Sequence, residues 1–302
     1  MSAGTPLIVE VSINGLIGKQ ENPHVPIAAR EMADSCIACF EAGATIIHAH
    51  AGEPYVGEVR PHASAPYVDA FGPVLARFPG AALYPTLPAG PALPIEGRYV
   101  HIEALADAGL LRLAPIDVGT MNWGRIAPDR SSNENLIYVN TYAEVDYVFA
   151  FCRKRRLGCT IGIFEPGFLQ LVLAHARMGT LPEGSVLKFE FSTGRKLMFG
   201  LPPTAVGLDA YLSMLGDLQL PWIVNLRDGD LMEGFGRLAI ERGGHVRVGI
   251  EDYGGPRTPR NEDLVAEIVS LGRSLGREPA TVANLPDLLR LPTQSARHQT
   301  SR

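Results

Sequence analysis

Short apolar runs alternate with longer amphipathic stretches along nearly the whole chain. Eight runs rich in aliphatic and β-branched residues predict strands. Their ranges are 7–14, 45–51, 81–87, 110–119, 159–165, 187–193, 222–227 and 245–252. Between and after them, apolar residues recur at helical spacing and predict helices. The helical ranges are 26–43, 67–78, 98–109, 142–158, 165–179, 205–215, 230–244 and 261–276.

Eight strand-then-helix units in about 270 residues predict an α/β chain folded as a single-domain (β/α)8 TIM barrel over residues 1–302. A doubly wound open sheet is the alternative, but no G-x-G-x-x-G follows the first strand. Several predicted helices end in glycine, as a helix C′ position favours. These glycines are Gly43, Gly109, Gly158, Gly179 and Gly243. The end of the chain predicts one last helix and a frayed tail from about residue 290 to 302.

Two histidines, His48 and His50, stand at the end of the second predicted strand. Their i, i+2 spacing aims both side chains into the mouth of the barrel, where barrel enzymes carry their chemistry. Two imidazoles are too few to hold zinc tightly, so a third ligand is needed. Alternation along the last predicted strand places Glu251 on the interior side, where it can supply this ligand. The pattern therefore predicts a mononuclear metal site, although an isolated H-x-H also serves simply to cap a strand.

Polar residues at other strand ends are candidates for substrate contacts. Thr86 ends the third predicted strand, Asn14 ends the first, and Thr120 and Asn122 follow the fourth. The same residue types also cap tight turns, so both interpretations stay open. A binuclear hydrolase site is poorly supported, because no histidine falls at the end of the fifth or sixth predicted strand.

Composition narrows the class of protein. A formal net charge of −5 and a pI near 5.9 argue against a nucleic-acid partner. No apolar run of 18 residues and no basic leader segment occur, which predicts a cytoplasmic protein without membrane association. Cys36 and Cys39 form a C-x-x-C inside a helical pattern, and no second pair completes a tetrahedral thiolate set, so we expect both in the core.

Four segments together resemble the β-keto acid cleavage enzymes, which include 3-keto-5-aminohexanoate cleavage enzyme. They are SINGLIG, NPHVPIAAREMADSCIACFEAGATIIHAHAG, IDVGTMNWG and GGHVRVGIEDYGG. The resemblance implies zinc-dependent condensation of a β-keto acid with acetyl-CoA, giving acetoacetate and a new acyl-CoA. It implies zinc binding by His48, His50 and Glu251, and substrate binding at Thr86 and Thr120. It also implies a homo-oligomer, a tetramer by the family pattern.

The same resemblance assigns proton abstraction to Arg247 and Asp252. Because a guanidinium is a poor base, we expect Asp252 to accept the proton and Arg247 to orient it or to hold the enolate. The chain departs from the family pattern at Gly52, where many members carry arginine. It also departs near Ile17, where the acid that recognises an amino group would stand. The aminohexanoate substrate is therefore not expected.

Coenzyme A needs cationic partners for its phosphates. Arg125, Arg153, Arg156 and Arg227 are candidates, and the sequence does not choose among them. Two other functions fit the same barrel. One is a metal-dependent hydrolase or aldolase that works without CoA, and the other is a non-catalytic barrel that binds a small acid.

Overall fold

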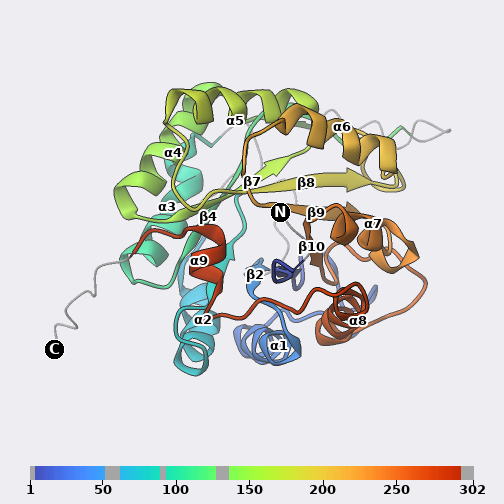
Figure 1. Ribbon diagram of the computed structural model, residues 1–302. Helices are drawn as coiled ribbons and strands as arrows, with labels where there is room; N and C mark the ends of the chain where they lie inside the picture. Colours follow the sequence, from blue (N-terminus) through green and yellow to red (C-terminus); the bar gives the residue numbers. More distant parts are fainter. Residues whose placement is uncertain (1–3, 52–61, 89–92, 127–135, 294–302) are drawn as a thin grey trace, which may run out of the picture.

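The structure, a computed structural model, describes residues 4–51, 62–88, 93–126 and 136–293. Eight parallel strands form a nearly closed barrel in the order β3-β2-β1-β10-β9-β8-β7-β4 (Figure 1). Their bounds are β1 Val9–Ser12, β2 Ile46–Ala49, β3 Ala82–Pro85, β4 Leu113–Asp117, β7 Gly158–Ile163, β8 Val186–Ser192, β9 Trp222–Arg227 and β10 His245–Val248. The end strands β3 and β4 approach each other and nearly complete the ring. The predicted TIM barrel is confirmed.

Helices connect the strands and pack around the barrel (Figure 1). Their bounds are α1 Ala29–Ala42, α2 Ala65–Arg77, α3 Ile95–Asp107, α4 Tyr142–Arg155, α5 Pro166–Met178, α6 Ala205–Leu215, α7 Phe235–Glu241 and α8 Asn261–Ser274. One predicted helix, 230–244, is interrupted. Gly234 has a φ of 116° and separates the short 3-10 helix η1, Leu231–Glu233, from α7.

Alternation along each strand divides the buried residues between two regions. Every second side chain along a strand, such as those of Val9, Val11 and Ile47, points outward and packs against the surrounding helices. The intervening side chains enter the barrel, where Ile8 and Ile46 belong to an apolar floor near the strand N-termini. The last helix, α9 Leu285–Leu289, contributes Leu285 and Leu289 to this floor. The predicted final helix is therefore present. Of the predicted frayed tail, 290–302, Leu291 is buried in this floor, and residues 294–302 lie outside the described residues.

The prediction that Gly158 ends a helix is wrong. Helix α4 reaches its left-handed C-cap at Arg156, with a φ of 55°, and Gly158 is the first residue of β7. A Cβ atom at position 158 would lie 2.7 Å from the carbonyl oxygen of Gly184. Glycine is therefore needed here for close packing rather than for its backbone conformation. Gly43, Gly109, Gly179 and Gly243 do have positive φ angles beyond their helices.

A small antiparallel hairpin follows β4 and was not predicted. Strand β5, Met121–Trp123, pairs with β6, Leu136–Tyr138. Each strand has only three residues, which is too short for an alternating pattern to stand out in the sequence. The hairpin places the segment after β4 at the mouth of the barrel.

Candidate active site

Three candidate metal ligands converge at the C-terminal ends of the strands. His48 lies on β2, His50 immediately follows it, and Glu251 follows β10, so β1 lies between the two sources of ligands. His48 Nε2 lies 3.5 Å from Glu251 Oε2, and His50 Nε2 lies 3.7 Å from Glu251 Oε1. All three donor groups fall within 4.8 Å of one another. The structure thus brings together the three residues that the sequence assigned to metal binding.

These distances suit a zinc ion. Ligand atoms bound tetrahedrally at about 2.0–2.1 Å are about 3.3–3.4 Å apart, close to the separations found here. Burial lowers the pKa of His48 well below 6.5 and favours the neutral imidazole that a metal needs. Burial alone would raise the pKa of Glu251, but Arg247 and Arg227 outweigh it and hold the pKa well below its ordinary value. The donor set is therefore two imidazoles, of which His48 is held neutral by burial, and one ionised carboxylate.

Gly15, directly after β1, makes room for the carboxylate ligand. It has a φ of 57°, and a Cβ at this position would lie 2.2 Å from Glu251 Cγ. Only glycine satisfies both conditions without moving Glu251. The sequence placed Asn14 at the end of the first strand, but the role of Gly15 was not predicted, because the contact spans 236 positions of the chain.

Arg247 and Asp252 form the second predicted pair. Arg247 Nε donates to Asp252 Oδ2 at 2.8 Å, and Ser12 Oγ donates to the same oxygen at 2.5 Å. Asn225 Nδ2 donates to Asp252 Oδ1 at 3.2 Å, and Arg227 Nη1 lies 3.2 Å from that oxygen. Asp252 is thus fixed by four donors beside the metal ligands.

Arg247 links this carboxylate to the ligand set. Its Nη2 lies 3.1 Å from Glu251 Oε2, and its Nη1 donates to Glu10 Oε1 at 3.2 Å. Burial alone would lower the pKa of Arg247, but the carboxylates of Asp252 and Glu251 raise it well above its ordinary value. The guanidinium therefore remains charged and orients two carboxylates at once.

A polar layer below the ligands connects the strands further. Tyr84 donates its hydroxyl to Glu10 Oε1 at 2.5 Å, and Lys188 Nζ donates to the Tyr84 oxygen at 3.4 Å. The Tyr84 ring stacks on His48, with centroids 4.7 Å apart, and so supports the orientation of the imidazole. This layer was not predicted from the sequence. A signal existed, because Glu10 and Lys188 stand at interior parity within otherwise apolar strands.

The charges of this connected network favour a cation. Its ionic side chains are Glu10, Glu190, Glu251, Asp252, Lys188, Arg227 and Arg247. Four carboxylates against three cations give a net charge of −1 while the histidines are neutral. A divalent ion changes this sum to +1, and an anionic substrate then brings it to zero. Such compensation matters because uncompensated charge is costly inside a protein.

Asn14 is buried but uses its side-chain amide on backbone groups. Its Nδ2 donates to the carbonyl oxygens of His50 and Pro26, at 2.6 and 3.0 Å. Its Oδ1 accepts from the backbone N–H groups of His50 and Gly15, at 2.9 and 3.0 Å. The residue thus fixes the chain at the second candidate ligand, His50, and a direct contact with substrate stays a prediction.

The other candidate substrate residues lie on the same rim. Thr86 is buried just after β3, where its carbonyl oxygen lies 2.9 Å from Nε2 of His101. Thr120 is exposed, and its hydroxyl accepts from the backbone N–H of Asn140 at 3.2 Å. Asn122 is exposed on the hairpin strand β5. Their roles toward substrate stay predictions.

The four candidate arginines for coenzyme A separate by position. Arg227 belongs to the network around Asp252, and Arg125 is exposed beyond the hairpin strand β5. Arg153 and Arg156 are wrong as candidates for this site. They lie at the end of α4 just before β7, and the segments that enter strands lie at the opposite face of a barrel from the metal ligands. Gly52, the departure from the family pattern, lies outside the described residues.

The C-x-x-C cysteines are part of the hydrophobic core, as predicted. Cys36 and Cys39 are fully buried on α1. Burial raises the pKa of Cys36 to about 12, which disfavours the thiolate that redox or metal chemistry requires.

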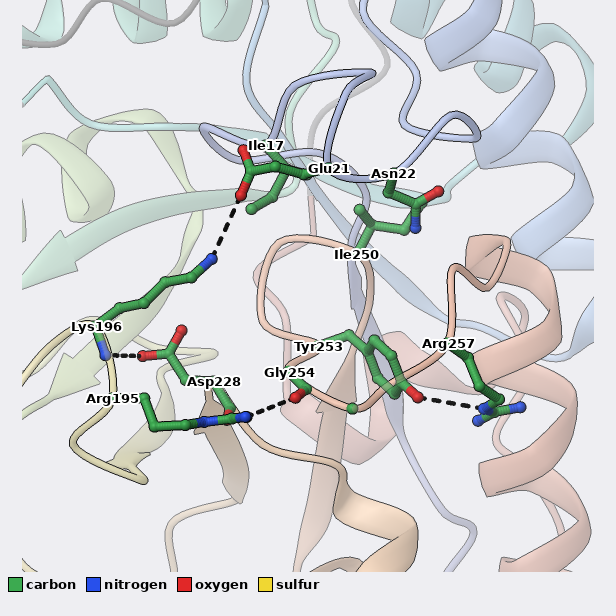
Figure 2. Close-up of a pocket in the computed structure, with 11 residues that line it drawn as sticks. Ile17, Glu21, Asn22, Arg195, Lys196, Asp228, Ile250, Tyr253, Gly254 and Arg257 are labelled. Atoms are coloured by element: carbon green, nitrogen blue, oxygen red, sulfur yellow. Dashed lines mark hydrogen bonds and ion pairs between the residues drawn. The ribbon is translucent and has the colours of Figure 1, made fainter.

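A cavity of about 280 Å³ opens among the loops that follow the strands (Figure 2). Residues from the segments after four strands line it: Ile17, Glu21 and Asn22 after β1, Arg195 and Lys196 after β8, Asp228 after β9, and Ile250, Tyr253, Gly254, Gly255 and Arg257 after β10. Ile250 and Tyr253 of its wall flank Glu251 and Asp252 in the chain, and Asp228 follows Arg227. The cavity thus lies at the same end of the barrel as the metal ligands.

Comparisons with known proteins agree with this geometry. A family model described as beta-keto acid cleavage enzyme matches residues 6–291. The chain is 27% identical to a 3-keto-5-aminohexanoate cleavage enzyme of Fusobacterium nucleatum, over 94% of this chain and 98% of the relative. It is 28% identical to a 3-oxoadipate:acetyl-CoA acetyltransferase of Cupriavidus necator, over 95% of this chain and 96% of the relative.

Solved structures support the fold. ObcA in binary complex with oxaloacetate superposes with a TM-score of 0.66 at 16% identity, over 90% of this chain and 68% of that one. Among the described residues, no helix has the length and apolar character that crossing a bilayer requires.

Proposed function

This chain belongs to the beta-keto acid cleavage enzyme family, and from that premise we propose that it is a zinc-dependent enzyme acting on a β-keto acid and acetyl-CoA. The products are acetoacetate and the CoA thioester of the remaining acyl group. Family membership supports catalysis on a keto acid, and the names of two relatives, 3-oxoadipate:acetyl-CoA acetyltransferase and 3-dehydrocarnitine:acetyl-CoA trimethylamine transferase, support acetyl-CoA as the second substrate.

One observation carries the proposal. His48, His50 and Glu251 present their donor atoms within 4.8 Å of one another, and Arg247 joins that set to Asp252. Three protein ligands leave a coordination position for substrate, which is the arrangement of catalytic rather than structural zinc sites. A zinc ion held there supplies Lewis acidity, which polarises the keto group and acidifies the α-carbon between the keto and carboxylate groups.

Asp252 accepts the α-proton in this proposal. Its two carboxylate oxygens receive four donors, so one of these donors must move away to free an oxygen lone pair for the incoming proton. The hydroxyl of Ser12 is the most mobile of these donors, because rotation about one bond redirects it. Arg247 keeps its charge and holds Asp252 next to Glu251 throughout the transfer.

The carbon–carbon bonds then form and break in two stages. The α-carbon of the keto acid forms a bond to the acetyl carbonyl carbon, and the CoA thiolate leaves. The thiolate next attacks the original β-keto carbonyl, and the bond between that carbon and the α-carbon breaks. The released acetoacetate takes up the proton that Asp252 holds, and the second product is the new acyl-CoA.

Labelled acetyl-CoA tests this assignment. The purified protein, loaded with zinc, is incubated with acetyl-CoA carrying ¹³C in the carbonyl carbon and with a panel of β-keto acids. We expect the label in the keto carbon of acetoacetate and a new unlabelled acyl-CoA in equal amount. Carbon NMR and mass spectrometry detect both products.

The same experiment separates the competing functions. Consumption of a keto acid at the same rate without acetyl-CoA indicates a hydrolase or aldolase, and contradicts the proposal. Binding of keto acids without turnover, with or without acetyl-CoA, indicates a binding barrel and contradicts it equally.

A further inference from the structure

The cavity among the loops after β1, β8, β9 and β10 has a wall of mixed charge. Its lining includes three cations, Arg195, Lys196 and Arg257, and two acids, Glu21 and Asp228. Figure 2 shows these side chains around one space, with Lys196 extending toward Glu21 from the facing loop. The wall therefore carries one more positive than negative charge, beside the apolar side chains of its other residues.

Two of these cations are neutralised by carboxylates. Lys196 Nζ lies 3.6 Å from Glu21 Oε2. Arg257 makes two hydrogen bonds to Glu267, at 2.6 and 2.9 Å, and Nη2 of Arg257 lies 3.8 Å from Asp230. Neither cation brings an uncompensated charge to the cavity.

Arg195 differs from both. Within the described part of the chain, it forms no ion pair with a carboxylate. Its Nη2 donates to the backbone carbonyl oxygens of Asp228 and Gly254, and its Nε donates to Thr193 Oγ1 at 3.3 Å. These bonds hold the exposed guanidinium in place, and its hydrogen bonds go to backbone and hydroxyl oxygens rather than to carboxylates. Figure 2 shows the side chain directed to Gly254 at the edge of the cavity.

We propose that this cavity, centred on Arg195, recognises an anionic group of a substrate. The inference rests on the proposed function, because it takes the ligand set as the place where the keto acid binds. A guanidinium is suited to carboxylate and phosphate oxygens, and binding such a group would give Arg195 an ionic partner.

Position and size restrict the ligand. Ile250 and Tyr253 flank the metal ligand Glu251 and the base Asp252, and consecutive Cα atoms are only about 3.8 Å apart. The cavity therefore lies on the side toward which a molecule bound at the ligand set would extend if it followed the loops after β1 and β10. About 280 Å³ accommodates a short chain or a single phosphate but not the whole of CoA. The anion is thus either a second carboxylate at the far end of the keto acid or a phosphate of CoA.

Paired substrates distinguish these two sources. 3-Oxoadipate and 3-oxohexanoate have the same number of carbons, and only the former has a terminal carboxylate. Acetyl-CoA and acetyl-pantetheine have the same thioester, and only the former has phosphates. KM values for each pair are measured for the unaltered protein and for Arg195→Gln, Arg195→Lys and Arg237→Gln. Arg237 is an exposed arginine on α7 and serves as the matched control.

Two outcomes support the inference. A KM for 3-oxoadipate raised about tenfold or more by Arg195→Gln, with changes below about twofold for 3-oxohexanoate, identifies a carboxylate tail. The same selective increase for acetyl-CoA but not acetyl-pantetheine identifies a phosphate. In either case we expect a smaller increase in KM for Arg195→Lys than for Arg195→Gln, and no change in KM for Arg237→Gln.

Two other outcomes overturn it. Changes below about twofold for all four substrates show that Arg195 recognises no anion. Equal increases for the charged and uncharged members of both pairs show that Arg195 only holds its loops.

Direct binding keeps this test separate from the proposed function. Calorimetry measures the affinity of the unaltered and Arg195→Gln proteins for adipate against hexanoate, and for CoA against pantetheine. If no keto acid yields acetoacetate, the proposed function fails, and these affinities still decide the inference. Weaker binding of only the anionic member of a pair in Arg195→Gln supports it, and identical affinities contradict it.

Discussion

At the residue scale, the site depends on small residues as much as on charged ones. Glu251 reaches the histidines because Gly15 has no side chain, and Asn14 fixes the chain at His50 through two of its four hydrogen bonds. The histidine pair and Glu251 were predictable, because strand parity and the resemblance both pointed to them. The role of Gly15 was not, because a steric contact between distant segments leaves no local pattern in the sequence.

Gly15→Ala is expected to weaken zinc binding about 10- to 100-fold, the size of effect seen when support around a metal ligand is lost. The added Cβ would lie 2.2 Å from Glu251 Cγ and must displace that side chain. Calorimetric zinc titration of the metal-free proteins measures the change. Gly109→Ala is the control, since Gly109 has a φ of 74° but open space around the added atom. Equal zinc affinities of the two variants would contradict the role given to Gly15.

Asp252→Asn is expected to lower kcat about 10²- to 10⁴-fold, because an amide cannot accept the α-proton. Zinc affinity should change by only a few-fold, since Asp252 is not among the three ligands. Steady-state kinetics and zinc titration of the same preparation check both expectations. Asp209→Asn, at an exposed ion pair with Arg242, controls for the loss of one negative charge. Full activity of Asp252→Asn would exclude Asp252 as the base.

At the element scale, alternation along the strands explains both the core and the site. One parity of each strand packs against the helices, and the other forms an apolar floor and a polar upper layer. Hydrophobic patterning was sufficient to predict eight strands and eight surrounding helices, because burial repeats with a fixed period in each. It did not predict the three-residue strands β5 and β6 or the break at Gly234, where the local geometry depends on very few residues.

Helix α9 closes the floor of the barrel. Shortening a buried side chain of this helix should therefore destabilise the protein without changing its catalytic rate. Leu289 is 2% exposed and packs in the floor cluster with Ile46 and Ile223. Leu289→Ala is expected to lower the free energy of unfolding by about 2–5 kcal/mol, while kcat at a permissive temperature is unchanged. Urea unfolding measures the loss, with Val206→Ala, 80% exposed on α6, as control. Equal stability of the two variants would show that α9 contributes no buried packing.

At the scale of the whole molecule, buried neutral histidines make stability depend on pH. Burial, reinforced by the charge of Arg277, lowers the pKa of His245 from 6.5 to about 3. Burial likewise lowers the pKa of His101 to about 4. Each histidine takes up a proton in the unfolded chain at a pH where the folded chain does not. Their contribution to stability is therefore complete above pH 6.5 and declines as the pH falls toward these values.

His245→Asn should reduce this acid sensitivity. Nδ1 of His245 accepts the backbone N–H of Ile8 at 3.0 Å, and an asparagine oxygen can replace that acceptor without titrating. Between pH 6.5 and 5, the slope of unfolding free energy against pH is expected to flatten by up to about 1.4 kcal/mol per pH unit. Urea titrations at several pH values measure it, with His24→Asn, at an exposed loop residue, as control. An unchanged slope would mean that His245 titrates alike in both states.

The single-domain organisation, the cytoplasmic location and the tetramer stay predictions at this scale. The central claim is that a zinc ion at His48, His50 and Glu251 is required for cleavage of a β-keto acid. The most direct measurement titrates metal-free protein with zinc and follows acetoacetate formation from acetyl-CoA and a β-keto acid. We predict that activity rises in proportion to added zinc, reaches a plateau at about one ion per chain, and does not rise in Glu251→Gln. Full activity of the metal-free protein, or equal activation of Glu251→Gln, would contradict the claim.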